Sequence, residues 1–388
     1  MKRSEGRILT THAGSLTRPK ELLDAFQANA SEETLQPLLR TSVADVIRHQ
    51  AESGIDIVND GEFGKPSRAI VDYAAWGSYI FDRLDGFNLQ EGVTNVGPHS
   101  SKDRADFGEF YASGEIPGGG GGVARSYQLV CTGPLKYTGQ ALVQRDIEIF
   151  KAGLSGVNVE DAFISAVSPA TVTIRKSEHY ARDEDYSWAA AEALNEEYRA
   201  IVEASLVLQI DDPCIVDLYD WWFSLNHTWE EYRHWAEFQV EVMNHALEGI
   251  PEDRIRYHFC WGSWHGPHSS DVELKDVVDL LLRIKAQAYS VEAGNVRHAH
   301  EWKVWRDVAR LPEGKILIPG VVSHATNVIE HPELIADRLT NYAEAVGREN
   351  VIAGTDCGLG GRIHPQLAWA KLHTLRQGAD LASKQLWR

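Results

Sequence analysis

The chain has 388 residues with a formal net charge of −18 at pH 7, and 43% of its residues are hydrophobic. This acidic balance, without any basic run, argues against binding to nucleic acid or to an anionic membrane. No apolar stretch approaches the roughly 20 residues that a membrane-spanning helix needs, and the N-terminus has no signal-peptide core, so we expect a cytoplasmic protein.

The four cysteines are expected to be thiols, because a cytoplasmic chain of this length rarely uses disulfides. Cys131 and Cys214 are predicted to be plain buried thiols. Cys260 and Cys357 stand at the ends of predicted strands beside other potential metal ligands, which makes them candidates for a metal site.

The N-terminal third alternates between strand and helix patterns. The elements expected here are a strand at 8–15, helices at 19–28 and 32–52, and a strand at 55–60. Residues 66–125 are an irregular insertion that contains the glycine run 118–122. This run predicts either a flexible connector or the hinge of a lid over the active site, because long loops in compact domains tend to be functional.

The same alternation continues to the C-terminus. Further strands are expected at 126–131, 206–210, 256–260, 288–292, 316–321 and 351–356. Helices are expected at 140–154, 186–204, 229–247, 275–285, 300–309, 332–346 and 365–383. A weak strand pattern at 162–166 is left out of the count. Eight apolar strands separated by amphipathic helices predict one (β/α)8 TIM barrel over residues 1–388, with an insertion at about 66–125.

The barrel is favoured over its alternative, a doubly wound open sheet, by the positions of polar residues. Polar side chains with potential for chemistry follow the predicted strand ends at Ser15, Glu62, Asp211, His258, Cys260, Glu292 and Cys357. The carboxyl ends of the strands carry the active site in TIM-barrel enzymes.

The strand at 256–260 ends in two side chains of metal-ligand type. His258 and Cys260 are two residues apart, so on a strand they point to the same face. An imidazole and a thiolate on one face suit a soft to borderline divalent ion, above all zinc. Glu292 and Cys357 end two later apolar runs and can complete a set of four ligands, although no CxxC or HExxH spacing marks the site.

Taken jointly, the strand-end motifs resemble those of the cobalamin-independent methionine synthase family. The matching segments are 10–15, 60–62, 131–134, 210–213, 258–260, 292, 319–321 and 356–359. In the Ile-Asp-Asp-Pro segment, Asp212 replaces the family's glutamate. The resemblance implies a zinc ion held by His258, Cys260, Glu292 and Cys357. It also implies that Ser15, Glu62 and Asp211 hold the amino-acid end of a homocysteine-like thiol.

The activity implied by the resemblance is zinc-dependent methyl or alkyl transfer, in which a zinc-bound thiolate attacks an electrophilic carbon. The chain also resembles epoxyalkane:coenzyme M transferase, in which the same thiolate chemistry opens an epoxide. The expected partners are thus a small thiol acceptor and a small methyl or alkyl donor. The sequence does not decide whether this donor is a folate, another methyl carrier or an epoxide. The alternatives are a metal-free decarboxylase-type barrel and a non-catalytic zinc protein. A homo-oligomer is compatible with the sequence.

Three further residues near strand ends are candidates for the reaction. His265 is a candidate for a proton relay, and His324 is a candidate general acid for the leaving group. Trp261 is a candidate for substrate binding, within an aromatic lining that also includes Trp221, Trp222 and Trp264. For Ser15, Glu62 and Asp211 the alternative is a structural role in capping the helix that follows.

Overall fold

Eight parallel strands form a nearly closed barrel in the computed structural model, which describes residues 1–65, 79–80, 82–91, 101–113, 127–262 and 265–388. The strand order is β1-β10-β9-β8-β7-β6-β5-β2. The strands are β1 (Leu9–Thr10), β2 (Ile57–Asn59), β5 (Asp161–Val167), β6 (Val207–Asp211), β7 (Ile255–Phe259), β8 (Ala288–Glu292), β9 (Ile316–Val322) and β10 (Ile352–Thr355).

Hydrogen bonds between the two outermost strands of this order bring the sheet round into a barrel. The backbone N–H of Asp56 donates to the Thr10 carbonyl at 3.0 Å. The Thr11 hydroxyl donates to the Ile57 carbonyl at 3.0 Å. The prediction of a (β/α)8 barrel is therefore confirmed, and the open sheet is excluded.

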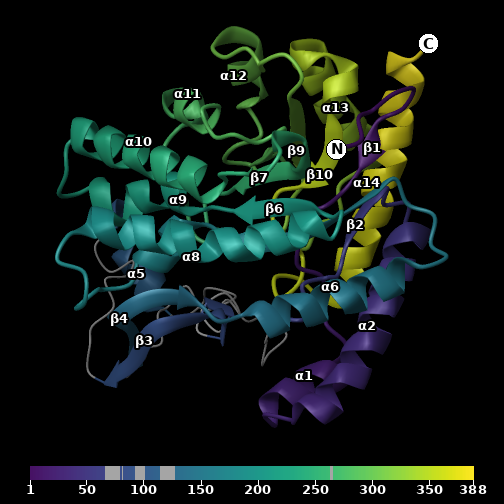
Figure 1. Cartoon of the computed structure of the whole chain (residues 1–388). Helices are drawn as coiled ribbons and strands as arrows, with labels where there is room; N and C mark the ends of the chain where they lie inside the picture. The colour runs from purple at the N-terminus through teal and green to yellow at the C-terminus, as the bar shows by residue number, and fades with distance from the viewer. Residues whose placement is uncertain (66–78, 81, 92–100, 114–126, 263–264) are drawn as a thin grey trace.

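Helices cover the outside of the barrel. They are α1 (Lys20–Gln27), α2 (Glu32–Glu52), α6 (Gln140–Leu154), α7 (Pro169–Thr173), α8 (Asp183–Glu203), α9 (Cys214–Leu218), α10 (Trp229–Ala246), α11 (Val278–Leu281), α12 (Trp302–Asp307), α13 (Pro332–Val346) and α14 (Pro365–Leu386). Figure 1 shows α14, near the C-terminus, beside β1 from the start of the chain. The contact is anchored by the Ser383 hydroxyl, which accepts a hydrogen bond from Ile8 N at 2.9 Å.

Local sequence signals set where several helices begin. α10 starts with a capping box, in which the Thr228 side chain accepts from Glu231 N and the Glu231 side chain accepts from Thr228 N. α13 and α14 each begin with proline after a histidine that caps the first turn. The helix predicted at 275–285 is shorter than expected, because only a 3₁₀ turn (Leu274–Asp276) and α11 form there.

The prediction of the third barrel strand was wrong. Residues 126–131 do not join the barrel: β4 (Tyr127–Tyr137) pairs antiparallel with β3 (Leu84–Glu91) in a separate two-stranded sheet. The barrel position belongs to β5, which contains the weak pattern at 162–166. Its small residues leave room inside the barrel: the Ser165 hydroxyl accepts a hydrogen bond from the Gln209 side chain of the neighbouring strand.

The insertion after β2 includes this hairpin and two short helices, α4 (Lys102–Asp106) and α5 (Gly108–Ala112). In Figure 1 the hairpin lies apart from the barrel strands, below α8. The glycine run 118–122 and residues 66–78, 92–100 and 114–126 lie outside the described residues. The division into one domain with an insertion at about 66–125 therefore stays a prediction.

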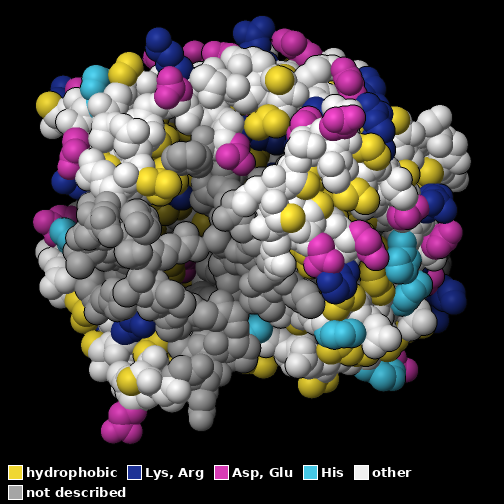
Figure 2. All heavy atoms as spheres, turned by 90° about the horizontal axis from the view of Figure 1, so that it is seen from below, with side chains coloured by type: hydrophobic (Ala, Val, Ile, Leu, Met, Phe, Trp, Pro, Cys, Tyr) yellow, Lys and Arg dark blue, Asp and Glu magenta, His cyan; other side chains and the backbone are white. Residues whose placement is uncertain are grey.

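The charged side chains on the surface and the composition of the helices are as the sequence predicts. Figure 2 shows basic side chains scattered singly among acidic ones over one face of the molecule. Within the described part of the chain, no helix is both long enough and apolar enough to cross a membrane.

Candidate metal centre

Three of the four predicted metal ligands meet at the carboxyl end of the barrel. His258 is on β7, Cys260 follows that strand, and Cys357 follows β10. Their ligand atoms all lie within 4.8 Å of one another. His258 and Cys260 are buried, and Cys357 is partly buried. Segments about a hundred residues apart thus converge on one point.

His258 is oriented for coordination through one ring nitrogen. Its Nδ1 lies 3.0 Å from the Ser290 hydroxyl, which fixes the ring. Its Nε2 is buried and has no hydrogen-bond partner among the described residues. A metal-ligating histidine commonly has its second nitrogen held in this way. The orphaned Nε2 next to two sulfurs therefore fits a zinc ion.

The two thiols share one negative charge. A hydrogen bond from the Cys260 thiol holds the pKa of Cys357 well below its ordinary value. The same hydrogen bond raises the pKa of Cys260 well above its ordinary value. One thiolate is therefore present before any cation binds, and zinc is the divalent ion that suits a sulfur-rich N/S set.

Glu292, the fourth predicted ligand, lies in an adjacent group. Its carboxylate is within 4.8 Å of ligand atoms of His324 and Asp356. Glu292 Oε1 accepts from Trp261 N at 2.8 Å, and Oε2 accepts from the Asn295 side chain at 2.6 Å. Burial raises the pKa of Glu292 well above its ordinary value, and the Asp356 carboxylate raises it further.

Asp356 was not singled out from the sequence. Its Oδ1 accepts hydrogen bonds from the backbone N–H groups of Ala293 and Gly294, both at 2.7 Å. These bonds join the segment after β8 to the segment after β10. Its Oδ2 is buried with no partner in the described part of the chain. The position directly after a strand, beside a cysteine, is the signal that could have identified it.

His324 lies just after β9 and is 2% exposed. Burial lowers its pKa to about 3, although the Cys357 thiolate acts in the opposite direction. The imidazole is therefore neutral at pH 7. A neutral imidazole is a poor source of protons, so the predicted role as a general acid requires a bound substrate whose negative charge raises this pKa.

The three residues predicted to hold the amino-acid end of a thiol lie at the same end of the barrel. The Ser15 hydroxyl donates to the Gly360 carbonyl at 3.2 Å, which places Ser15 beside the segment that follows Cys357. Glu62 is 4% exposed and has a positive φ of 61°, a strained conformation for this residue type. Its Oε2 lies 3.6 Å from Lys65 Nζ.

Asp211 ends β6, and its Oδ1 accepts from the Gln209 side chain at 2.6 Å. Burial raises its pKa to about 7; the charges of His258, Glu62 and Cys357 also act on it. The helix-capping role considered as the alternative belongs to its neighbour, because Asp212 Oδ1 accepts from Cys214 N at 3.1 Å.

The other two predicted residues have different surroundings. Trp261 is 0% exposed, and its indole N–H donates to the Val272 carbonyl at 2.9 Å. Its ring is therefore part of the core, and only its backbone N–H faces the site. His265 is half-buried in the loop after Cys260 and is close enough to His324 to influence its pKa.

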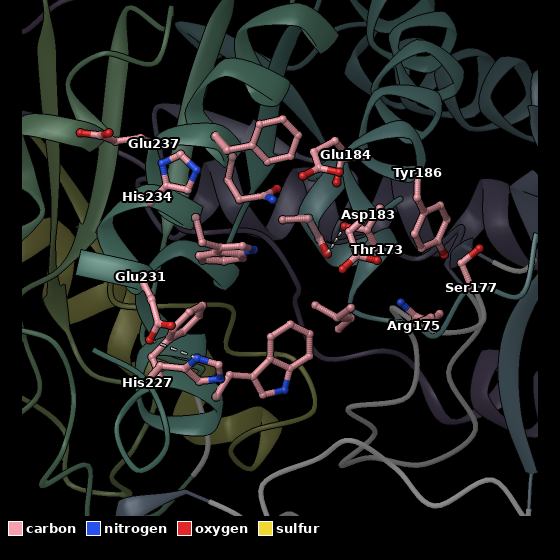
Figure 3. A pocket seen from close by; sticks show the side chains of 18 of the residues that line it. Thr173, Arg175, Ser177, Asp183, Glu184, Tyr186, His227, Glu231, His234 and Glu237 are labelled. Atoms are coloured by element: carbon pink, nitrogen blue, oxygen red, sulfur yellow. Dashed lines mark hydrogen bonds and ion pairs between the residues drawn. The ribbon is translucent and has the colours of Figure 1, made fainter. Parts of the chain in front are cut away.

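A separate cavity of about 960 Å³ lies between α8 and α10. In Figure 3, Glu231, His234 and Glu237 line one side, and Asp183, Glu184 and Tyr186 line the other. Trp222, predicted to line the active site, lines this cavity, and Trp264 is outside the described residues. None of the predicted metal ligands borders this cavity.

A glycine in β9 permits the close approach of the last metal-ligand segment. A Cβ on Gly320 would overlap the backbone of Thr355 and Asp356. We expect Gly320→Ala to destabilise the fold by about 3 kcal/mol, which is at the upper end of the range for overpacking. The reason is that the backbone of Thr355 and Asp356, unlike a side chain, cannot rotate away from the added methyl group. The substitution should also weaken zinc binding, since Cys357 is displaced with Asp356.

Urea unfolding and a zinc competition assay measure these two effects. The matched control is Gly108→Ala, where a Cβ meets nothing within 4 Å. Unchanged stability and unchanged zinc affinity in Gly320→Ala would show that the β9–β10 contact does not position the site.

Comparison with known proteins identifies relatives over nearly the whole chain. The model of the family described as "Cobalamin-independent synthase, Catalytic domain" matches residues 166–381, which is more than half of the chain. The 2-hydroxypropyl-CoM lyase of Xanthobacter autotrophicus is 22% identical over 378 residues, covering 91% of this chain and 87% of that protein. The methionine synthase of Sulfolobus acidocaldarius is 24% identical over 387 residues, covering 97% and 93%.

A solved structure has the same fold. It is a B12-independent methionine synthase from Shewanella sp. W3-18-1 in complex with selenomethionine, with a TM-score of 0.71 and 19% sequence identity. The match covers 98% of this chain and 99% of that one.

Proposed function

The chain belongs to the cobalamin-independent synthase catalytic-domain family, and on that premise we propose that it is a zinc-dependent S-methyl- or S-alkyltransferase acting on a small thiol. The observation that carries the proposal is the buried convergence of His258, Cys260 and Cys357 at the carboxyl end of the barrel. Structural zinc sites usually have locally clustered ligands. Ligands from different strands at this end of a barrel are typical of an active site.

We assign His258, Cys260 and Cys357 as three zinc ligands and Glu292 as the fourth. A zinc ion in this position keeps the substrate thiol deprotonated at neutral pH, and the thiolate is the nucleophile that takes the alkyl group. Glu292 remains satisfied when it does not coordinate, because Trp261 N and the Asn295 side chain each donate to one of its oxygens. This makes Glu292 the ligand that can best yield its place to a substrate sulfur.

The charges at the mouth of the site favour an amino thiol as the acceptor. The carboxylate of Glu62 is close enough to Asp211 to raise the pKa of Asp211. An ammonium group between them would relieve this repulsion. A homocysteine-like thiol carries such a group, with a carboxylate that the Ser15 hydroxyl can bind. Coenzyme M carries a sulfonate and no ammonium group, so the two carboxylates would repel it.

A second candidate is addition of a coenzyme M-like thiol to an epoxide. The similarity to 2-hydroxypropyl-CoM lyase over 91% of this chain favours it. Both candidates use the same thiolate chemistry, and they differ in the charge of the acceptor's tail. The carbon donor is an electrophilic methyl or alkyl compound in the first case and an epoxide in the second.

Calorimetric titration of the zinc-loaded enzyme with homocysteine and with coenzyme M distinguishes these candidates. We expect homocysteine to bind, and Glu62→Gln to weaken its binding by roughly tenfold to a hundredfold, the contribution of a hydrogen bond between charged groups. Coenzyme M should bind Glu62→Gln no worse than wild type. Glutamine keeps the shape and the backbone strain of Glu62, so the change tests the charge.

The control for the titration is Glu313→Gln, which removes an exposed carboxylate. Tight coenzyme M binding to wild type would establish the second candidate. If neither thiol binds the zinc-loaded enzyme, a thiol of this size is not the acceptor and the proposed function fails.

A further inference from the structure

We propose that the His298 ring is a positioning group for Glu292, holding one oxygen of this carboxylate in place through Trp261, while the turn that includes the His298 backbone holds the other through Asn295. The inference rests on the proposed function, because it concerns the ligand that yields its place to the substrate. His298 is 3% exposed and lies in the segment after β8, six residues beyond Glu292. It belongs to neither group of converging metal-ligand atoms described above.

The ring of His298 is clamped between two buried carboxylates. Its Nδ1 lies 2.9 Å from Glu301 Oε2, and its Nε2 lies 3.0 Å from Asp271 Oδ2. When both carboxylates are ionised, both ring nitrogens must donate, so the ring is an imidazolium. Burial opposes this charge, but the two carboxylates outweigh it and raise the pKa of His298 to about 10. The ring is therefore fixed in orientation and in charge.

The clamp is itself anchored in the surrounding loops. Glu301 Oε1 accepts from Leu274 N at 2.7 Å. Asp271 also accepts from His268 Nδ1 at 3.0 Å. The backbone N–H groups of His268 and Ser269 donate to Asp103, on α4 of the insertion, at 2.9 and 3.0 Å. The imidazolium is thus the common partner of two loops at this end of the barrel.

One route from His298 to Glu292 runs through Trp261. The two rings stack with centroids 3.8 Å apart and an angle of 18° between their planes. The indole N–H is also fixed by the Val272 carbonyl. The backbone N–H of Trp261 donates to Glu292 Oε1 at 2.8 Å. The stacked imidazolium therefore holds the residue that holds one oxygen of the carboxylate.

The second route runs through Asn295. Its Oδ1 accepts from the backbone N–H groups of Arg297 and His298, both at 2.9 Å. Its Nδ2 donates to Glu292 Oε2 at 2.6 Å. The backbone of the turn that leads to His298 therefore sets the position of the Asn295 amide. One oxygen of Glu292 therefore depends on the stacked His298 ring, and the other depends on the backbone of the same turn.

A double-mutant cycle tests whether His298 acts through Glu292. Zinc affinity is measured by chelator competition for wild type, His298→Gln, Glu292→Gln and the double variant. We expect His298→Gln to weaken zinc binding by roughly tenfold to a hundredfold, as loss of a partner behind a metal ligand does. In the Glu292→Gln background the same change should cost about twofold or less.

A spectroscopic measurement separates positioning from general damage. The cobalt(II) absorption spectrum of His298→Gln should shift towards that of Glu292→Gln, because both variants lose the ordered carboxylate. The control is His300→Gln, which changes an exposed histidine on the same segment and should match wild type. Where His298→Gln does not fold, Asp271→Asn carries the test, since it removes one side of the clamp and keeps the residue's shape.

The outcomes are distinct from those of the proposed function. Equal losses of zinc affinity in both backgrounds, or no loss in wild type, would overturn the positioning role while leaving the zinc site intact. Failure of the wild-type protein to bind zinc at all would overturn the proposed function itself.

Discussion

The Cys357→Ser variant is expected to lose stoichiometric zinc and, with it, thiol alkylation. Structural zinc sites bind with roughly 10–16 kcal/mol, so loss of one ligand among four costs about 3 kcal/mol, or roughly a hundredfold in affinity. Cys357 is the thiolate of the site. The substitution therefore removes the ligand that is already ionised before the metal binds. Without zinc, a free thiol of pKa about 8.5 is only a few per cent ionised at pH 7.

Metal content after dialysis and single-turnover alkylation measure this effect. The matched control is Cys214→Ala, because Cys214 is a buried thiol that packs with Ala170 and Leu218 outside the metal centre. That variant should keep both zinc and activity. An unchanged zinc affinity of Cys357→Ser in a chelator competition would remove Cys357 from the ligand set and with it the basis for the proposed chemistry.

The protonation of the two thiols adds a readout to the same comparison. Cys260 keeps its proton in the zinc-free protein, because its pKa lies well above the ordinary value. Zinc binding at pH 7 should therefore release protons from Cys260 and from His258, whose pKa is raised by Cys357, but little from Cys357, which is already a thiolate. Calorimetry in two buffers of different ionisation enthalpy counts these protons.

The sequence was sufficient for the fold because the barrel strands are buried on both faces and read as apolar runs. β7, β8, β9 and β10 appear within a few residues of their predicted positions. It was not sufficient for the third strand. β5 is rich in small residues, which its interior position requires, whereas β4 is a longer run that pairs outside the barrel. Apolar periodicity alone does not distinguish these two kinds of strand.

In the candidate site, too, the sequence predicts residues that follow strand ends but not residues whose roles depend on contacts between loops. Strand ends identified His258, Cys260 and Cys357, because in parallel strands they converge on one edge. Asp356 and Asn295 were missed, since their roles depend on contacts within and between the loops at the ends of the strands. The neutral state of His324 also depends on burial, which no motif reports.

A buried ion pair behind the loop that carries His324 provides a second large effect. We expect Lys371→Met to destabilise the fold by about 3–5 kcal/mol, because it leaves a buried carboxylate without its partner. Lys371, on α14, is 0% exposed, and its Nζ donates to Glu330 Oε2 at 2.8 Å and to the Val328 carbonyl at 2.6 Å. Glu330 Oε1 in turn accepts from Ser323 N at 2.9 Å.

The double variant Lys371→Met/Glu330→Gln separates two effects of Lys371→Met: loss of the attraction between Lys371 and Glu330, and burial of a Glu330 carboxylate without a partner. Glutamine still accepts from Ser323 N but carries no charge, so urea unfolding should show recovery of most of the lost stability. Lys384→Met, on the exposed face of the same helix, should stay within about 0.5 kcal/mol of wild type. If the double variant is as unstable as Lys371→Met, the loop around His324 is held by the hydrogen bond to Val328 and not by compensation of the Glu330 charge.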